Sequence, residues 1–157
     1  MSSLWRISNY PSLSGEGGLH FAARWHSAGH RIVYFAESPA GALVEALVHL
    51  ELGAEDWPRS YQLTEAGYPD KLRPETLDPS SARDWRTKLS LTRKLGDEWL
   101  RSARSALARV PSAILPDTWN VLLNPDQPDA AQIRVIKTVR ADYDPRLVAA
   151  PRRPKHS

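Results

Sequence analysis

The pattern of hydrophobic and polar positions is clearest in the first third of the chain. Ile32–Ala36 is β-branched, aromatic and apolar, and turn-forming residues bound it on both sides, which predicts a buried strand. Ser38 is a good N-cap, and Pro39 suits the first helical position because no backbone N–H is needed there. We therefore predict a helix from about Pro39 to Leu52 that ends before Gly53.

One residue of this predicted helix contrasts with its surroundings. Glu45 lies roughly opposite the main apolar stripe of the helix, but its neighbours on that side are again mostly small or apolar. The helix is thus apolar nearly all round and is expected to be buried on both sides. A carboxylate in such a wall needs a partner or a chemical task. The pattern leaves two interpretations of Glu45 open: a structural ion pair with a nearby arginine, or a functional acid.

The rest of the chain combines short strand patterns with one long helical pattern. Apolar residues recur at helical spacing between Ser81 and Val110, where Gly96 is a candidate break between two helices. We also predict strands at Leu4–Ile7, Tyr61–Leu63, Val110–Pro116 (an edge-like strand), Trp119–Pro125 and Ile133–Val139, a strand or turn at Leu19–Trp25, and a loop at Tyr10–Gly18. This order predicts one mixed α+β domain over residues 1–148. The basic, proline-rich residues 149–157 are expected to be disordered.

Composition narrows the chemistry that the chain can perform. It has 157 residues and no cysteine, which excludes disulfides, thiolate metal sites and a cysteine nucleophile. No apolar run approaches membrane-spanning length, so we expect a cytoplasmic protein. The formal net charge of +3 suits a phosphate-bearing small molecule or an acidic partner and favours nucleic acid only weakly. His20, His26 and His30 lie close in sequence, but no H-E-x-x-H motif accompanies them, and we predict no metal site.

Several polar residues occupy apolar contexts and together suit one ligand. They are Arg6, Arg24, Tyr34, Glu45 and Ser112, with Asn120 and Asn124 as additions. Two arginines can bind a pyrophosphate through charge-assisted bonds, and a tyrosine ring can stack on a heteroaromatic base. A carboxylate can hold ribose hydroxyls and stabilise an oxocarbenium-like transition state. The set therefore suits cleavage of the nicotinamide–ribose bond of NAD.

The order of these residues along the chain resembles the RES domain family, the toxins of bacterial toxin–antitoxin pairs. The resemblance spans residues 4–148. It rests on Trp5-Arg6, Gly18, Phe21, Arg24-Trp25, Arg31–Tyr34, Ser38–Ala40, Leu43–Glu45, Pro111-Ser112, Asn120–Pro125 and Tyr143–Leu147. It implies a mixed, split sheet with flanking helices, similar to the fold of ADP-ribosyltransferase toxins, and an NAD cleft in that sheet.

The resemblance also implies roles for the candidate residues. Arg6 and Arg24 would bind the phosphates, Tyr34 would stack near the nicotinamide, and Glu45 would act at the ribose. Ser112 would line the nicotinamide or phosphate side, and Asn120 is a further binding candidate. Of these, Glu45, Tyr34 and Arg24 are the predicted catalytic residues.

Family members degrade NAD by hydrolysis or phosphorolysis, so NAD would be the substrate, inorganic phosphate a candidate co-substrate, and no other cofactor is expected. A DNA-binding antitoxin would block the cleft with its C-terminal segment, and we expect a homo-oligomer within the toxin–antitoxin complex. Two alternatives remain open: a mono-ADP-ribosyltransferase acting on a protein, and a non-enzymatic module that binds nucleic acid or protein. In the nucleic-acid alternative, basic residues and exposed aromatics should share one face.

Overall fold

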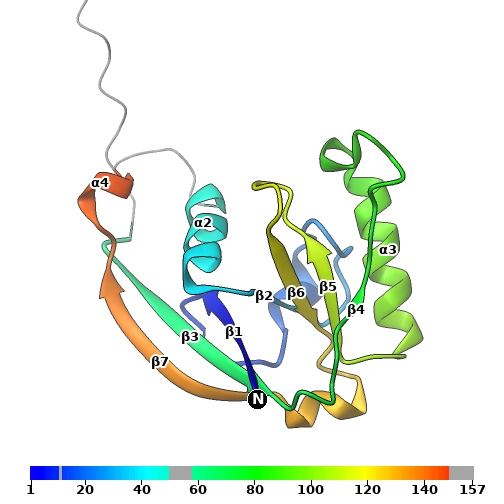
Figure 1. Ribbon diagram of the computed structural model, residues 1–157, viewed down its shortest axis with the longest axis horizontal. Helices are drawn as coiled ribbons and strands as arrows, with labels where there is room; N and C mark the ends of the chain where they lie inside the picture. Colours follow the sequence, from blue (N-terminus) through cyan, green and yellow to red (C-terminus); the bar gives the residue numbers. More distant parts are fainter. Residues whose placement is uncertain (11, 50–57, 149–157) are drawn as a thin grey trace, which may run out of the picture.

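The computed structural model describes residues 1–10, 12–49 and 58–148 of the chain. These form a mixed α+β domain around a seven-stranded sheet with the order β4-β5-β6-β2-β1-β3-β7 (Figure 1). The strands are β1 (Ser2–Ile7), β2 (Val33–Ala36), β3 (Ser60–Tyr68), β4 (Glu75–Thr76), β5 (Leu107–Pro111), β6 (Trp119–Leu123) and β7 (Arg134–Asp142). The helices are α1 (Gly17–His20), α2 (Pro39–His49), α3 (Leu89–Ser102) and α4 (Pro145–Val148), with the 3-10 turns η1 (Trp85–Thr87) and η2 (Pro128–Gln132).

The sheet is nearly split in the middle. Strands β1 and β2 are paired at only one position, Trp5 opposite Ala36, whereas β1 pairs with β3 along its whole length. Figure 1 shows the consequence: β1, β3 and β7 form one wing, β2, β6, β5 and β4 form the other, and α2 stands over the junction. All pairs are antiparallel except β4 with β5. The predicted α+β class with a mixed split sheet is confirmed.

Hydrophobic cores lie on the two faces of the sheet. Successive strand residues point to opposite faces, so neighbours along β2 and β6 contribute to different cores. The first core contains Leu4, Val33, Phe35, Val121 and Leu123. The second contains Trp25, Trp85, Trp99, Ala108 and Leu122, and it includes the buried side of α3. The second core joins α3 to the loop around Trp25, which lies next to the site described below.

Helix α3 is shorter than the pattern predicted. The prediction of a helix from Ser81 to Val110 is wrong at both ends, because residues 85–87 form a 3-10 turn and residues 107–111 form β5. Ala103 adopts a left-handed conformation with φ of 49°, which ends α3. Gly96 does not break the helix. A Cβ atom there would lie 1.6 Å from the carbonyl oxygen of Trp25, so the glycine allows the loop to touch the helix.

Other predicted elements differ in extent. The strand alternative for Leu19–Trp25 is wrong, because α1 occupies its start and a turn closed by a bridge between Ala23 and His26 follows. The Tyr10–Gly18 loop ends inside α1, and the Tyr61–Leu63 strand extends to β3, Ser60–Tyr68. The edge-like strand predicted at Val110–Pro116 is wrong in extent and in position: only Val110 and Pro111 belong to a strand, β5, and β5 has neighbours on both sides. The predicted end of α2 at Leu52 and the tail 149–157 lie outside the described residues. None of the helices within residues 1–10, 12–49 and 58–148 is long and apolar enough to cross a membrane.

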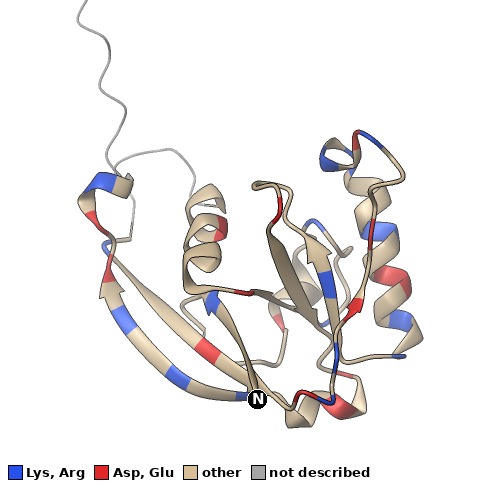
Figure 2. Ribbon diagram, viewed as in Figure 1, with Lys and Arg blue, Asp and Glu red and all other residues tan. Residues whose placement is uncertain are grey.

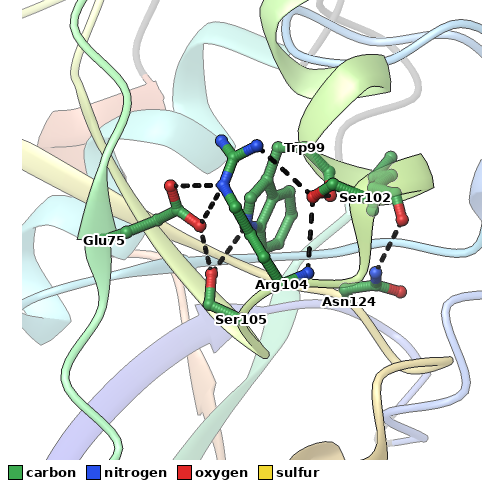
Figure 3. A network of polar contacts seen from close by, with 7 residues as sticks. Glu75, Trp99, Ser102, Arg104, Ser105 and Asn124 are labelled. Atoms are coloured by element: carbon green, nitrogen blue, oxygen red, sulfur yellow. Dashed lines mark hydrogen bonds and ion pairs between the residues drawn. The ribbon is translucent and has the colours of Figure 1, made fainter.

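A polar network fastens the end of α3 to the sheet (Figure 3). The indole Nε1 of the fully buried Trp99 donates to Ser105 Oγ at 2.9 Å, and the Ser105 hydroxyl donates to the carboxylate of Glu75 in β4. Arg104 Nε donates to the same carboxylate at 2.9 Å. Asn124 Nδ2, just after β6, donates to the carbonyl of Leu100 at 3.1 Å. These contacts tie α3 to three strand segments and give it a fixed position.

Candidate active site

A cleft of about 530 Å³ opens where β1 diverges from β2. Its walls come from the end of β1, the loop at residues 23–25, β2, α2, the start of β3, the segment after β5, β6 and Tyr143. Most of the lining is apolar. Five of the six predicted site residues line it: Arg6, Arg24, Tyr34, Glu45 and Asn120. The sixth, Ser112, lies between cleft-lining neighbours and is 2% exposed.

Glu45 projects from α2 toward β6 and the segment that follows β5. The helix begins as predicted, with the Ser38 hydroxyl oxygen accepting a hydrogen bond from Gly41 N at 2.9 Å. Glu45 Oε1 accepts two hydrogen bonds, from Ser112 Oγ at 3.1 Å and from Asn120 Nδ2 at 2.8 Å. Among the described residues, no basic side chain pairs with Glu45. The structural ion-pair interpretation therefore has no support in this part of the chain, and Glu45 is a carboxylate held by neutral groups.

Ser112 positions Glu45 in this structure. Its Oγ donates to Glu45 and accepts hydrogen bonds from the backbone N–H groups of Ile114 at 3.1 Å and Leu115 at 3.3 Å. The hydroxyl thus has its donor and its two acceptor positions occupied. A direct contact of Ser112 with a ligand stays a prediction, because it requires one of these bonds to be exchanged.

Asn120 has one amide atom satisfied and one not. Its Nδ2 donates to Glu45, which fixes the orientation of the amide, since an ionised carboxylate only accepts. Its Oδ1 is buried and has no hydrogen-bond partner within the described parts of the chain. A buried acceptor without a donor costs free energy. Asn120 Oδ1 is therefore a polar atom of the cleft that lacks a hydrogen-bond donor within these residues.

Tyr34 is held by His26, a residue that the sequence suggested only as a metal ligand. His26 Nε2 lies 2.8 Å from the carbonyl oxygen of Phe21, which can only accept, so Nε2 carries a proton. Burial lowers the pKa of His26, which favours the neutral ring, and Nδ1 then accepts from the Tyr34 hydroxyl at 2.7 Å. The Tyr34 oxygen also accepts from Trp25 N at 3.1 Å, and burial raises the pKa of Tyr34, which keeps it a neutral phenol.

The other nearby histidines give no sign of a metal centre in the described residues. His30 Nε2 lies 3.7 Å from Asp97 Oδ1. Within residues 1–10, 12–49 and 58–148, no three histidine or acidic side chains cluster as a metal site requires. His26 is better explained as the group that orients Tyr34 than as a ligand.

The two arginines of the cleft each bond a backbone carbonyl. Arg24 Nη1 donates to the carbonyl of Arg86 at 2.9 Å, and Arg6 Nη1 donates to that of Ser12 at 3.2 Å. In the described segments, neither guanidinium pairs with a carboxylate. Burial lowers the pKa of Arg6, but arginine stays charged in proteins. The cleft therefore holds positive charge that is available to an anion.

Charge elsewhere on the described surface is mixed. Figure 2 shows basic and acidic positions interspersed along α3, where Arg93, Lys94 and Arg101 share the helix with Asp97 and Glu98. Five of the six tryptophans lie in the described residues, and Trp25, Trp85 and Trp99 are buried in the second core. The combination of a one-sign basic face with exposed aromatics, which a nucleic-acid-binding module needs, is not seen in this helix.

Comparison with known proteins places the chain in a family. The RES domain matches residues 3–144. A protein named Toxin Res from Pseudomonas putida is 45% identical over 132 residues, which cover 84% of this chain and 90% of that protein. A protein named Prs ADP-ribosylating toxin from Sphingobium sp. is 35% identical over 160 residues, which cover 94% of this chain and 97% of that protein.

A solved structure shares the fold. It is the crystal structure of the M. tuberculosis MbcT–MbcA toxin–antitoxin complex, in which a chain matches with a TM-score of 0.69 and 19% identity over 94% of this chain and 86% of that chain. The fold and the cleft thus define an α+β protein with a split sheet and a charged cleft at the split. The chain belongs to the RES domain family.

Proposed function

We propose that this protein is the toxin of a bacterial toxin–antitoxin pair and that it cleaves the nicotinamide–ribose bond of NAD. The observation that carries the proposal is Glu45, a carboxylate held on one oxygen by two neutral donors, in the same cleft as two arginines. The names of the relatives from Pseudomonas putida and Sphingobium support the toxin assignment.

The geometry suggests how each residue would act on NAD. Arg6 and Arg24 would bind the pyrophosphate through their remaining N–H donors, and Tyr34 would present its ring beside the nicotinamide. Glu45 would use Oε2, which has no hydrogen bond within the described residues, at the ribose. As the C1′–N1 bond breaks, its electron pair goes to the nicotinamide ring, and positive charge develops on the ribose. A fixed carboxylate stabilises that charge more than it stabilises the bound substrate, which is what accelerates the reaction.

The acceptor of the ADP-ribosyl group distinguishes three versions of the reaction. Water would give hydrolysis, inorganic phosphate would give phosphorolysis, and a side chain of a target protein would give ADP-ribosylation. In each case, the acceptor oxygen or nitrogen bonds to C1′ and loses a proton. The relative from Sphingobium is named an ADP-ribosylating toxin, which favours protein transfer as the alternative to NAD degradation.

An antitoxin is the proposed protein partner. The structure that shares this fold was solved as a toxin–antitoxin complex. We propose that a cognate, DNA-binding antitoxin of this chain covers the cleft, and that the toxin forms a homo-oligomer within the complex. The positive charge of Arg6 and Arg24, which no carboxylate pairs with in the described segments, suits an acidic or carboxylate-ended segment in the cleft.

The experiment that tests the activity is an incubation of the purified protein with NAD, with and without inorganic phosphate, followed by mass spectrometry. Free nicotinamide with ADP-ribose indicates hydrolysis, and ADP-ribose phosphate that appears only with phosphate indicates phosphorolysis. An added ADP-ribosyl mass on a protein in a cell extract indicates transfer. Folded protein that releases no nicotinamide under any of these conditions refutes the proposal.

A further inference from the structure

Helix α3 contacts the loop that carries Arg24 through one of its faces. Thr92, Arg93, Gly96 and Asp97 have the spacing i, i+1, i+4 and i+5, which places them on one side of the helix. All four meet the backbone of residues 23–27. We infer that this face of α3 is a positioning platform for Arg24 and that Thr92 is its central positioning residue, an inference that rests on the proposed NAD-cleaving function.

The platform holds the loop by its peptide groups. Thr92 Oγ1 donates to the carbonyl of Arg24 at 2.5 Å, and Thr92 is fully buried. Arg93 Nε donates to the carbonyl of Ala23 at 2.8 Å. On the other side of Arg24, Asp97 Oδ1 accepts from the backbone N–H of Ser27 at 2.9 Å. The loop is therefore hydrogen-bonded to α3 on both sides of Arg24, at Ala23 before it and at Ser27 after it, as well as at the carbonyl of Arg24 itself.

Gly96 sets how close the loop comes to the helix. The Trp25 carbonyl oxygen would lie 1.6 Å from a Cβ at position 96, far inside van der Waals contact, so only glycine fits. The next contact outward is that of Trp25 N with the Tyr34 hydroxyl. The platform thus fixes the main chain of Arg24. Through Trp25, it also fixes the backbone N–H that donates a hydrogen bond to the Tyr34 hydroxyl.

The position of the Arg24 guanidinium depends on how its backbone is held. Within the described residues its guanidinium is held by a single bond, to the carbonyl of Arg86 in the turn that precedes α3. Its backbone position therefore decides where the remaining donors point. The hydrogen bonds of Trp99, Ser105 and Glu75 fix α3 to the sheet. The platform is therefore held in a fixed position relative to β2 and β6, the strands that carry Tyr34 and Asn120.

The decisive variant is Thr92→Val, which keeps the shape of the side chain and removes the hydroxyl, with Thr92→Ser as the conservative rescue. We expect Thr92→Val to raise the KM for NAD about 10-fold or more, since a misplaced Arg24 loses a hydrogen bond to a charged group of the substrate, which is enough to weaken binding by about that factor. Thr92→Ser should stay close to the wild type. The matched control is Thr138→Val, at an exposed position of β7. It should leave both kinetic constants unchanged.

Hydrogen exchange gives a readout that does not depend on activity. The backbone amides of Trp25 and Ser27 should exchange faster in Thr92→Val than in the wild type, while amides in β3 and β7 keep their protection. Should Thr92→Val fail to fold, Arg93→Ala removes the bond to Ala23 at a less buried position, and the same two measurements apply. We expect a smaller increase in KM for it.

The outcomes separate this inference from the proposed function. If the Trp25 and Ser27 amides exchange faster in Thr92→Val than in the wild type, but the wild type never cleaves NAD, the proposed function is refuted and the platform stands. An active wild type whose folded Thr92→Val variant keeps the wild-type KM and amide protection overturns the platform. A variant that loses only melting temperature and kcat, with KM unchanged, overturns it as well, since that result indicates a stability role alone.

Discussion

Replacement of Glu45 by glutamine tests the proposed mechanism most directly, because the structure explains why the fold should tolerate it. Both hydrogen bonds to Glu45 end on the same oxygen, Oε1. The amide oxygen of glutamine can accept the same two bonds from Ser112 and Asn120, and its NH₂ group takes the place of Oε2. Glu45→Gln therefore removes the charge and keeps the packing.

The expected changes in kcat and in the free energy of unfolding distinguish a catalytic role of the Glu45 charge from a structural role of its side chain. Loss of one preorganised electrostatic group typically costs about 100-fold to 1,000-fold in kcat, or roughly 2.7–4 kcal/mol. We expect that loss in Glu45→Gln, with a free energy of unfolding within about 1 kcal/mol of the wild type, because two hydrogen bonds lose only their charge assistance. Glu45→Ala should lose the same activity and also about 1–3 kcal/mol of stability, since it leaves Asn120 Nδ2 without its acceptor.

The assay is nicotinamide release at saturating NAD, combined with thermal melting and urea unfolding of the three proteins. For a chain of this size, the loss in Glu45→Ala corresponds to a Tm lower by roughly 3–10 °C. Activity of Glu45→Gln within tenfold of the wild type removes the carboxylate charge from the mechanism. A glutamine variant as unstable as the alanine variant refutes the argument that one oxygen accepts both bonds.

Three further predictions follow from individual side chains. Arg24→Ala should weaken NAD binding by roughly 2–5 kcal/mol through loss of a charged clamp, with Arg24→Lys restoring only part; unchanged affinity by calorimetry contradicts this. Thr64→Val should leave the free energy of unfolding unchanged or higher, because Thr64 Oγ1 is buried with no hydrogen-bond partner in the described residues; a loss in urea unfolding counts against it. Burial lowers the pKa of His26, so as the pH falls below about 6.5 the unfolded state binds more protons and stability drops. His26→Gln should flatten that part of the stability profile, although Asp97 and His30, the ionisable neighbours of His26, remain in place. An unchanged slope between about pH 7 and 5 contradicts the assignment.

Local signals made part of the fold predictable from the sequence. Strand β2 and the start of α2 follow from an apolar run, an N-cap and a proline at the first helical position, all within seven residues of each other along the chain. Glu45 stood out because its neighbours along the predicted helix are mostly small or apolar. The expectation that this helix is buried on both sides is wrong, since Ala42 is the only buried residue among residues 39–49 of α2 and Val48 is 58% exposed. The resemblance to the RES family predicted one cleft lined by the two arginines, Tyr34 and Asn120. In the structure these residues do line one cleft.

The errors occur where tertiary contacts override local pattern. Leu107 continues the helical spacing of α3, yet it belongs to β5 because Leu123 of β6 pairs with it and the left-handed Ala103 has already ended the helix. Thr92 and His26 gave no signal as supporting residues. The contacts of Thr92 with Arg24 span 68 positions in the chain, so no local period reports them. His26 lies close to Tyr34 in sequence, but its role depends on a buried hydroxyl that only the fold supplies.

The charged groups of the cleft share a feature that supports NAD as the proposed ligand. Glu45 is held by neutral donors, and the guanidinium groups of Arg6 and Arg24 are held by carbonyls. Opposite charges therefore line one cleft without an ion pair between them in the described residues. NAD carries the same division, with a cationic nicotinamide at one end and an anionic pyrophosphate in the middle. A purely anionic ligand would be repelled by Glu45, and a purely cationic one by the arginines, so we expect the cleft to favour a molecule that carries both signs of charge.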